Sequence, residues 1–221
     1  MMRLLRISSI GFSLFFLATI SNAQMGMRGG PQQFHGIFNP DVGHGAAYEI
    51  QTAKGQKVTM EVAVVGKESV DGKEGYWFET TTTGDSTGGV VMKILTVRDG
   101  ANTSVSKMVM QLPGRPPMEM PSQMMQRSNQ PQPADIRQMA DDVGSESVTT
   151  PAGTFQCEHY RMKDGSSDVW ISEKIPPYGL VKSQGKDTTM LLSKVITDAK
   201  DKITGTPQAF NPMMMGQPPQ H

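Results

Sequence analysis

The chain has 221 residues, with 21 basic and 21 acidic side chains, one cysteine and 18 methionines. This charge balance argues against nucleic acid or an acidic membrane surface as the main partner. A single cysteine cannot form an internal disulfide, so side-chain packing must hold the fold, and the length suits one domain with a real hydrophobic core.

The first 23 residues have the pattern of a secretory signal peptide. Arg3 and Arg6 precede an apolar run over residues 10–20, and Ala23 ends a short run of small residues that suits signal peptidase. The apolar run is shorter than the roughly 18 residues that a spanning helix needs. We expect cleavage after Ala23, no transmembrane anchor in the mature protein, and export to the periplasm or the medium. Loss of the two arginines leaves 19 basic and 21 acidic residues, a formal charge of −2.

Two segments near the ends of the chain are too rich in Gly, Gln and Pro to bury much surface. Residues 24–43 read QMGMRGGPQQFHGIFNPDVG, and residues 206–221 read TPQAFNPMMMGQPPQH. Such composition is typical of disorder. We predict a disordered leader and a disordered tail on either side of one β domain over residues 44–205.

Alternating apolar residues and frequent turn signals predict an antiparallel β-sheet across this domain. In KVTMEVAVV, residues 57–65, every second residue from Val58 to Val64 is apolar, as in a half-buried strand. The dipeptides at 71–72 and 99–100, both Asp-Gly, suit hairpin turns. Further strands are predicted at 74–83, 89–99, 104–112, 143–150, 154–163, 167–175, 179–184 and 188–198. The total is about eight to ten strands.

Residues 113–142 interrupt the strands with repeated prolines, which forbid a continuous strand or helix. Within this insert, ADIRQMADD at 134–142 has the composition for about two helical turns, with Asp135 as a candidate N-cap. We therefore predict a Pro- and Met-rich insert that contains one short helix.

The stretch VTTPAGTFQCEHY, residues 148–160, predicts a β-hairpin that carries the only cysteine. Pro151 presets the turn, and Gly153 can take the left-handed conformation that follows it. Phe155, Cys157 and His159 then share one face of the next strand. A buried thiol behaves as a small hydrophobe. We favour a structural Cys157 over an intermolecular disulfide or a reactive or metal-binding thiol.

A family resemblance rests on the same hairpin. VTTPAGTFQC, followed by DVWISEKIPPYGLVKS, resembles the C-terminal half of exported bacterial β-domains of unassigned function that include TapB-like proteins. Trp170 and the Gly-Leu-Val-Lys run at 179–182 match the pattern of these domains, and the close match covers about residues 146–184. The domain is also similar to the LolA/LolB lipoprotein-carrier superfamily. This resemblance implies a curved antiparallel half-barrel over an apolar cavity, and it supplies no catalytic residues.

These observations predict a non-enzymatic exported protein without a cofactor. We expect its concave face to bind a lipid or another apolar ligand. The predicted apolar interior consists of Met60, Val62, Tyr76, Phe78, Met92, Ile94, Met108, Met110, Trp170 and Leu192.

Three other functions stay open. Met118, Met120, Met124 and Met125 in the insert could bind Cu(I), because soft thioethers select that ion. A structural or assembly module could present strand edges to another envelope protein. GDSTGG at 84–89 matches G-x-S-x-G around Ser86. However, a predicted strand follows it instead of the helix that a nucleophile elbow needs, so we predict a β-turn there and no enzyme.

Overall fold

The computed structural model describes residues 36–84, 87–121, 125 and 132–210. The predicted signal peptide, the first part of the predicted leader, Ser86 and Met124 lie outside these residues. Within the described ranges, ten strands have five or more residues: β1 (Gly45–Thr52), β2 (Lys57–Val70), β3 (Lys73–Gly84), β4 (Thr87–Asp99), β5 (Asn102–Gln111), β8 (Ala140–Thr150), β9 (Gly153–Met162), β10 (Ser167–Ile171), β11 (Leu180–Gly185) and β12 (Thr188–Ile196). Three strands have two residues: β6 (Met118–Glu119), β7 (Gln132–Pro133) and β13 (Gln208–Ala209).

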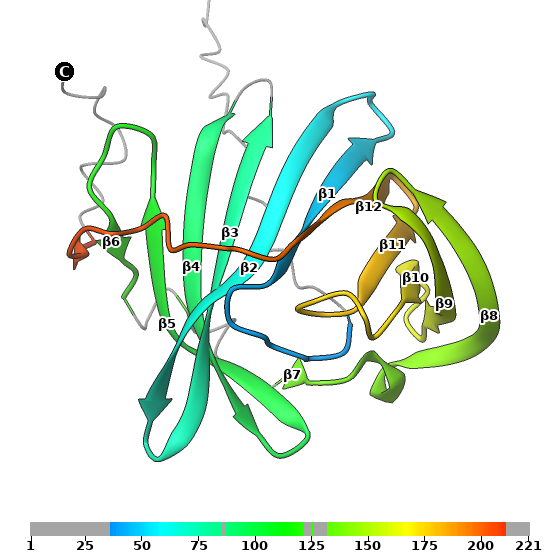
Figure 1. The fold of residues 1–221 in the computed structure, drawn as a ribbon, viewed down its shortest axis with the longest axis horizontal. Coiled ribbons are helices and arrows are strands. Elements are labelled where there is room, and N and C mark those ends of the chain that lie inside the picture. Colours follow the sequence, from blue (N-terminus) through cyan, green and yellow to red (C-terminus); the bar gives the residue numbers. More distant parts are fainter. Residues whose placement is uncertain (1–35, 85–86, 122–124, 126–131, 211–221) are drawn as a thin grey trace, which may run out of the picture. The chain divides into compact units, whose positions relative to one another are not determined.

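All these strands belong to one curved sheet (Figure 1), in the order β13-β6-β5-β4-β3-β2-β1-β12-β11-β10-β9-β8, with β7 paired to β5. Two antiparallel meanders, β1 to β6 and β8 to β12, join through the pairing of β1 with β12. The sheet does not close, because β13 and β8 form its two edges. The predicted fold class, a mostly β, curved antiparallel sheet, is confirmed.

Local sequence explains where the strands begin and end. Asp71 and Gly72 both have positive φ, 49° and 77°, as the predicted turn between β2 and β3 requires. Gly153 has φ 130° at the start of β9. Strand β1 is absent from the predicted set because Gly45 and the two alanines after it have little strand propensity. Its partners β2 and β12 impose the extended conformation instead.

The predicted disorder of residues 24–43 is wrong for the described part, residues 36–43. The N–H of Ile37 donates to the carbonyl of Tyr178 (2.9 Å) and the N–H of Phe38 donates to that of Ala134 (2.8 Å). A Cβ on Gly36 would lie 2.1 Å from the Tyr178 carbonyl oxygen, so only glycine permits this approach. Phe38 is 7% exposed, and its ring contacts that of Phe78 with centroids 5.6 Å apart. Composition suggested disorder, whereas non-local contacts order the segment.

Residues 206–210, the described part of the predicted disordered tail, also differ from the prediction. They contain β13, which pairs in parallel with β6. The helix in the insert is smaller than predicted. It is the 3-10 turn η2 (Ile136–Gln138), and the side chain of Asp135 caps it by accepting from the N–H of Arg137 (2.9 Å). Residues 140–142 were predicted to continue this helix, but they form the start of strand β8 instead.

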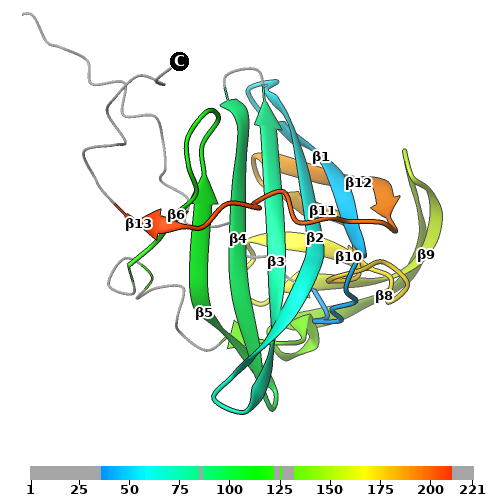
Figure 2. The ribbon, with the colours of Figure 1, turned by 60° about the vertical axis from the view of Figure 1, so that its left-hand side comes forward.

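Residues 198–210 form an extended strap that crosses the outer face of β2, β3 and β4 (Figure 2). The buried carboxylate of Glu79, 4% exposed, accepts from the backbone N–H of Lys202 (3.0 Å). The Lys202 ammonium donates to Glu61 (2.6 Å), and Lys93 forms an ion pair with Asp201. Burial raises the pKa of the Glu79 carboxyl above its usual range. The strap therefore covers the charged outer face of β2, β3 and β4 and keeps the Glu79 carboxyl group out of contact with water.

Replacement of Phe38 by alanine should lower the free energy of unfolding by about 3–5 kcal/mol, because a buried aromatic ring is lost. The matched control is Val42→Ala, since Val42 lies four residues on and is 45% exposed; its effect should stay within about 0.5 kcal/mol. Urea unfolding followed by circular dichroism measures both. Equal, small effects would contradict the ordered position of residues 36–43.

Glu79 should give the protein a pH-dependent stability. Its pKa is raised in the folded state, so above about pH 4.5 the unfolded chain releases a proton that the folded chain retains. This contribution to stability is therefore present at low pH and is lost as the pH rises through the raised pKa. Urea midpoints from pH 4 to 8 should show that Glu79→Gln removes this part of the pH dependence. Parallel profiles of the two proteins would contradict it.

Candidate functional site

The register of the strands defines an inner face of the sheet, opposite the strap. Three rows of cross-strand partners lie on it: Thr82, Met60, Tyr48 and Leu192; Val62, Thr80, Met92 and Met110; Val64, Phe78, Ile94 and Met108. Tyr76 shares the face by alternation along β3, and its ring also contacts Phe38. Nine of the ten residues predicted for the apolar interior thus lie on one face.

The half of this face around β1 and β12 is filled core. Met60 is 3% exposed and Leu192 is 0% exposed. Both belong to a hydrophobic cluster with buried residues of β8 to β11 and with Ile136 of η2. The Tyr48 hydroxyl within this cluster donates to the carbonyl of Leu180 (3.1 Å). This part of the predicted interior packs against the chain itself.

The half of the inner face on β3, β4 and β5 is covered less completely. Tyr76, Met92 and Ile94 are only half-buried, although β3 and β4 lie inside the sheet and not at its edge. Thr80 and Thr82 on the same face are also half-buried. Phe78, Met108 and Met110 on this half are buried, and Tyr76 and Ile94 pack against a small cluster that contains Phe38 and Phe78. The half-buried side chains form a partly covered apolar surface with two hydroxyl groups, which is the candidate ligand-binding face.

Trp170 is buried, but it lies on the opposite face of the sheet from Leu192, because its partner Lys182 pairs with Leu191. The indole stacks on the imidazole of His159 with centroids 4.3 Å apart. The Lys182 ammonium lies 4.1 Å from the centroid of the same indole ring. Trp170 was predicted to line the apolar interior together with Leu192, but the two side chains lie on opposite faces of the sheet. Trp170 is therefore not part of the candidate ligand-binding face.

Polar partners hold this stacked group in place. The Trp170 N–H donates to Glu146 (2.5 Å), and one ring nitrogen of His159 lies 2.9 Å from a carboxylate oxygen of Asp168. Asp168 also accepts from Arg161 (3.0 Å). Each charged side chain around Trp170 and His159 therefore has a partner. Such a fully paired set of polar side chains is typical of a network that stabilises the fold.

Cys157 is buried in the large hydrophobic cluster, with 2% of its surface exposed. Burial raises the pKa of its thiol to about 11. Because the thiolate is the reactive form, this environment suits the structural role predicted for the cysteine.

The methionines proposed as copper ligands fall in different environments. Met118 is 1% exposed and Met125 is 5% exposed, whereas Met120 is half-buried. Register places Met118 beside Met110, so an insert residue joins residues predicted for the apolar interior. Within the described ranges, histidine, cysteine, aspartate and glutamate side chains do not gather in groups of three or more that could hold a metal ion.

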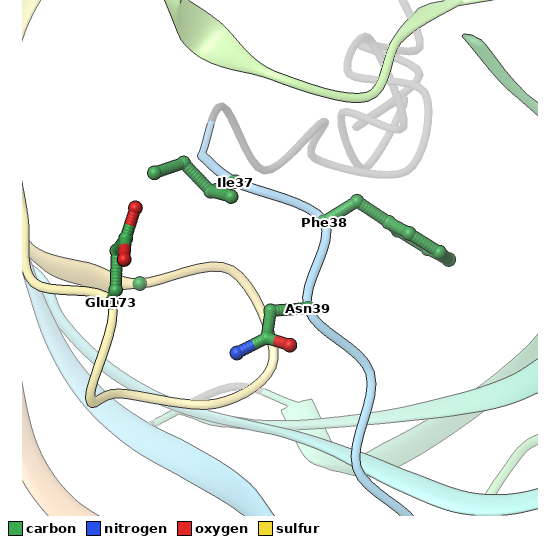
Figure 3. Close-up of a pocket in the computed structure, with 5 residues that line it drawn as sticks. Ile37, Phe38, Asn39 and Glu173 are labelled. Atoms are coloured by element: carbon green, nitrogen blue, oxygen red, sulfur yellow. The ribbon is translucent and has the colours of Figure 1, made fainter. Parts of the chain in front are cut away.

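A pocket of about 240 Å³ lies where residues 36–39 meet the loop between β10 and β11. Ile37, Asn39, Glu173 and Gly179 line it together with Phe38, whose ring points away from Glu173 (Figure 3). This pocket was not predicted, because residues 36–39 were expected to belong to a disordered leader. The lining includes one carboxylate, that of Glu173, and one amide, that of Asn39.

No family model matches this chain, and no curated protein matches it. One similar solved structure is described as an exported protein with a YmcC-like fold from Bacteroides fragilis. It has 13% identity and a TM-score of 0.40, over 73% of this chain and 99% of that chain. Another is described as a lipoprotein from Parabacteroides distasonis, with 15% identity and a TM-score of 0.35, over 74% of this chain and 100% of that chain. Among the residues that the structure describes, no helix has the length and apolar character needed to span a membrane.

Cys157 should resist thiol reagents in the folded protein. At pH 8 we expect no measurable reaction with an aromatic disulfide reagent in buffer and one thiol per chain in concentrated urea, because the buried thiol is protonated. A Thr154→Cys variant, with the new thiol at an exposed position on the same strand, should react quickly without urea and serves as the control. Fast labelling of the unmodified protein would contradict the structural assignment.

Proposed function

We propose that this chain is a non-enzymatic exported protein that holds an apolar ligand, such as a lipid acyl chain, against the inner face of β3, β4 and β5. The observation that supports the proposal most directly is the partial exposure of Met92 and Ile94 in the middle of the sheet. Isoleucine and methionine are among the residue types most often found fully buried. A bound apolar ligand would bury the surface of Met92 and Ile94 that is exposed without it.

The energetics favour an apolar occupant over a polar one. Each Å² of apolar surface removed from water contributes roughly 25 cal/mol, and Tyr76, Met92 and Ile94 all have surface left to bury. Methionine side chains adapt to ligands of different shape because they are unbranched and flexible. The hydroxyls of Thr80 and Thr82 lie on the same face and could accept or donate hydrogen bonds to a polar head group.

Two features of the sequence support the same function. The predicted signal peptide directs the protein to the periplasm or the medium, where a carrier would meet lipids of the cell envelope. The resemblance to the LolA/LolB carriers points to a half-barrel with an apolar cavity. In this protein the half of the sheet around β1 and β12 is filled, so the proposed site is confined to the partly open half.

A charged residue in the proposed site should abolish ligand binding. Ile94→Glu places a carboxylate among apolar side chains and should weaken the binding of a fluorescent fatty-acid analogue by about 100-fold, the equivalent of roughly 3 kcal/mol. Met92→Glu should act in the same direction. Fluorescence titration measures the affinities, and the thermal unfolding midpoint shows whether each variant is folded.

The matched control is Val143→Glu, because Val143 is 47% exposed on the edge strand β8. This variant should bind like the unmodified protein. Equal affinities in all variants, or no binding by the unmodified protein, would contradict the proposal. In the latter case chemical crosslinking in the native envelope would test the alternative of an assembly module with a protein partner.

A further inference from the structure

We infer that five methionines, on the inner face of β4 and β5 and in residues 118–120, form a binding site for a soft monovalent metal ion, Cu(I). We call this cluster the methionine face. Its members are Met92, Met108, Met110, Met118 and Met120. The site differs from the copper site predicted on the insert, because three of its residues come from long strands and only two from the insert.

Register brings the five side chains together. Met92 pairs with Met110, and Met110 pairs with Met118, so three thioethers follow one another across three adjacent strands. The N–H of Met120 donates to the carbonyl of Met108 (2.8 Å). These two residues therefore lie side by side, two residues along the strands from the pair of Met110 and Met118. Directly opposed residues in a sheet have Cβ atoms about 4.5–5.5 Å apart. Flexible thioethers at that spacing can converge on one ion.

The methionines are segregated by face. The residues between them, Lys93, Val109 and Glu119, are cross-strand partners of one another on the opposite face. General enrichment in methionine would place it on both faces, whereas here it lies on the inner one. Methionine also recurs on three strands at the same level of the sheet, where leucine would fill the space equally well.

The chemistry of the cluster selects the ion. Neutral thioethers bind Cu(I) and similar soft ions, whereas zinc, magnesium and calcium prefer nitrogen, thiolate or oxygen ligands. Met108, Met110 and Met118 are buried, and Met92 and Met120 are half-buried. An ion could therefore reach the site past the two half-buried residues and then be held among the three buried ones.

The site is tested by titrating the mature protein with Cu(I) under nitrogen, in competition with a chromophoric Cu(I) chelator. The unmodified protein should remove one Cu(I) per chain from the chelator. The triple variant Met92→Leu, Met110→Leu, Met118→Leu should lower the affinity by about 10-fold or more, because leucine has no donor atom. Thermal unfolding should show that this variant remains folded, since leucine has nearly the volume of methionine.

Two matched triple variants complete the design. Met60, Met162 and Met190 are buried in the large hydrophobic cluster, so their replacement by leucine reproduces the change in packing and should leave Cu(I) binding unchanged. Met213, Met214 and Met215 in the tail are replaced in the same way, and binding should again persist. The inference fails if the unmodified protein leaves Cu(I) on the chelator, if the methionine-face variant binds normally, or if either control loses binding equally.

Two variants separate this inference from the proposed function. The double variant Met118→Leu, Met120→Leu changes only residues outside β3 to β5, so it should lower the affinity for Cu(I) while the fatty-acid analogue still binds. Ile94→Glu should lose the fatty-acid analogue and still bind Cu(I), because Ile94 is adjacent to the methionine face but contributes no thioether. A loss of both ligands in both variants would overturn the assignment of a distinct metal site.

Discussion

The strands described in this protein all belong to one sheet, and this sets the physical constraint on everything else. A single sheet has two faces. The described residues contain no second layer of helices or strands, so within them each face is covered by extended chain or by the curvature of the sheet itself. The strap over residues 198–210 covers the outer face of β2 to β4, with Glu79 and Lys202 as its central contact. Residues 36–39 perform the equivalent role at one end of the inner face.

This constraint divides the inner face into two parts with different properties. Around β1 and β12 the side chains of β8 to β11 and of η2 fill the space, and the result is an ordinary core. On β3 to β5 apolar side chains stay partly exposed. The proposed ligand site and most of the inferred metal site lie in this second part, where flexible methionines of β4 and β5 lie beside Ile94. Function in this account depends on incomplete coverage of the sheet.

Much of the fold could be predicted from local sequence signals. Alternation identified β2, the Asp-Gly pair at 71–72 identified its turn, and the capping role of Asp135 was visible in the sequence. Local signals failed where distant contacts decide the structure. Residues 36–43 and 208–209 have the composition of disordered chain, yet they pair with segments far away in sequence. The face of Trp170 and the meeting of Met118 with Met110 follow from register between strands, which alternation within one strand does not specify.

The inner face is only partly covered at Tyr76, Met92 and Ile94 of β3 and β4, and it is filled around β1 and β12. Methionine side chains report on both regions, so the most direct measurement is an NMR spectrum of methyl-labelled methionine recorded while a medium-chain fatty acid is added. We expect the resonances of Met92, Met108 and Met110 to shift with added ligand, whereas those of Met60, Met162 and Met190 should not. Equal shifts in both groups, or shifts in the second group alone, would contradict it.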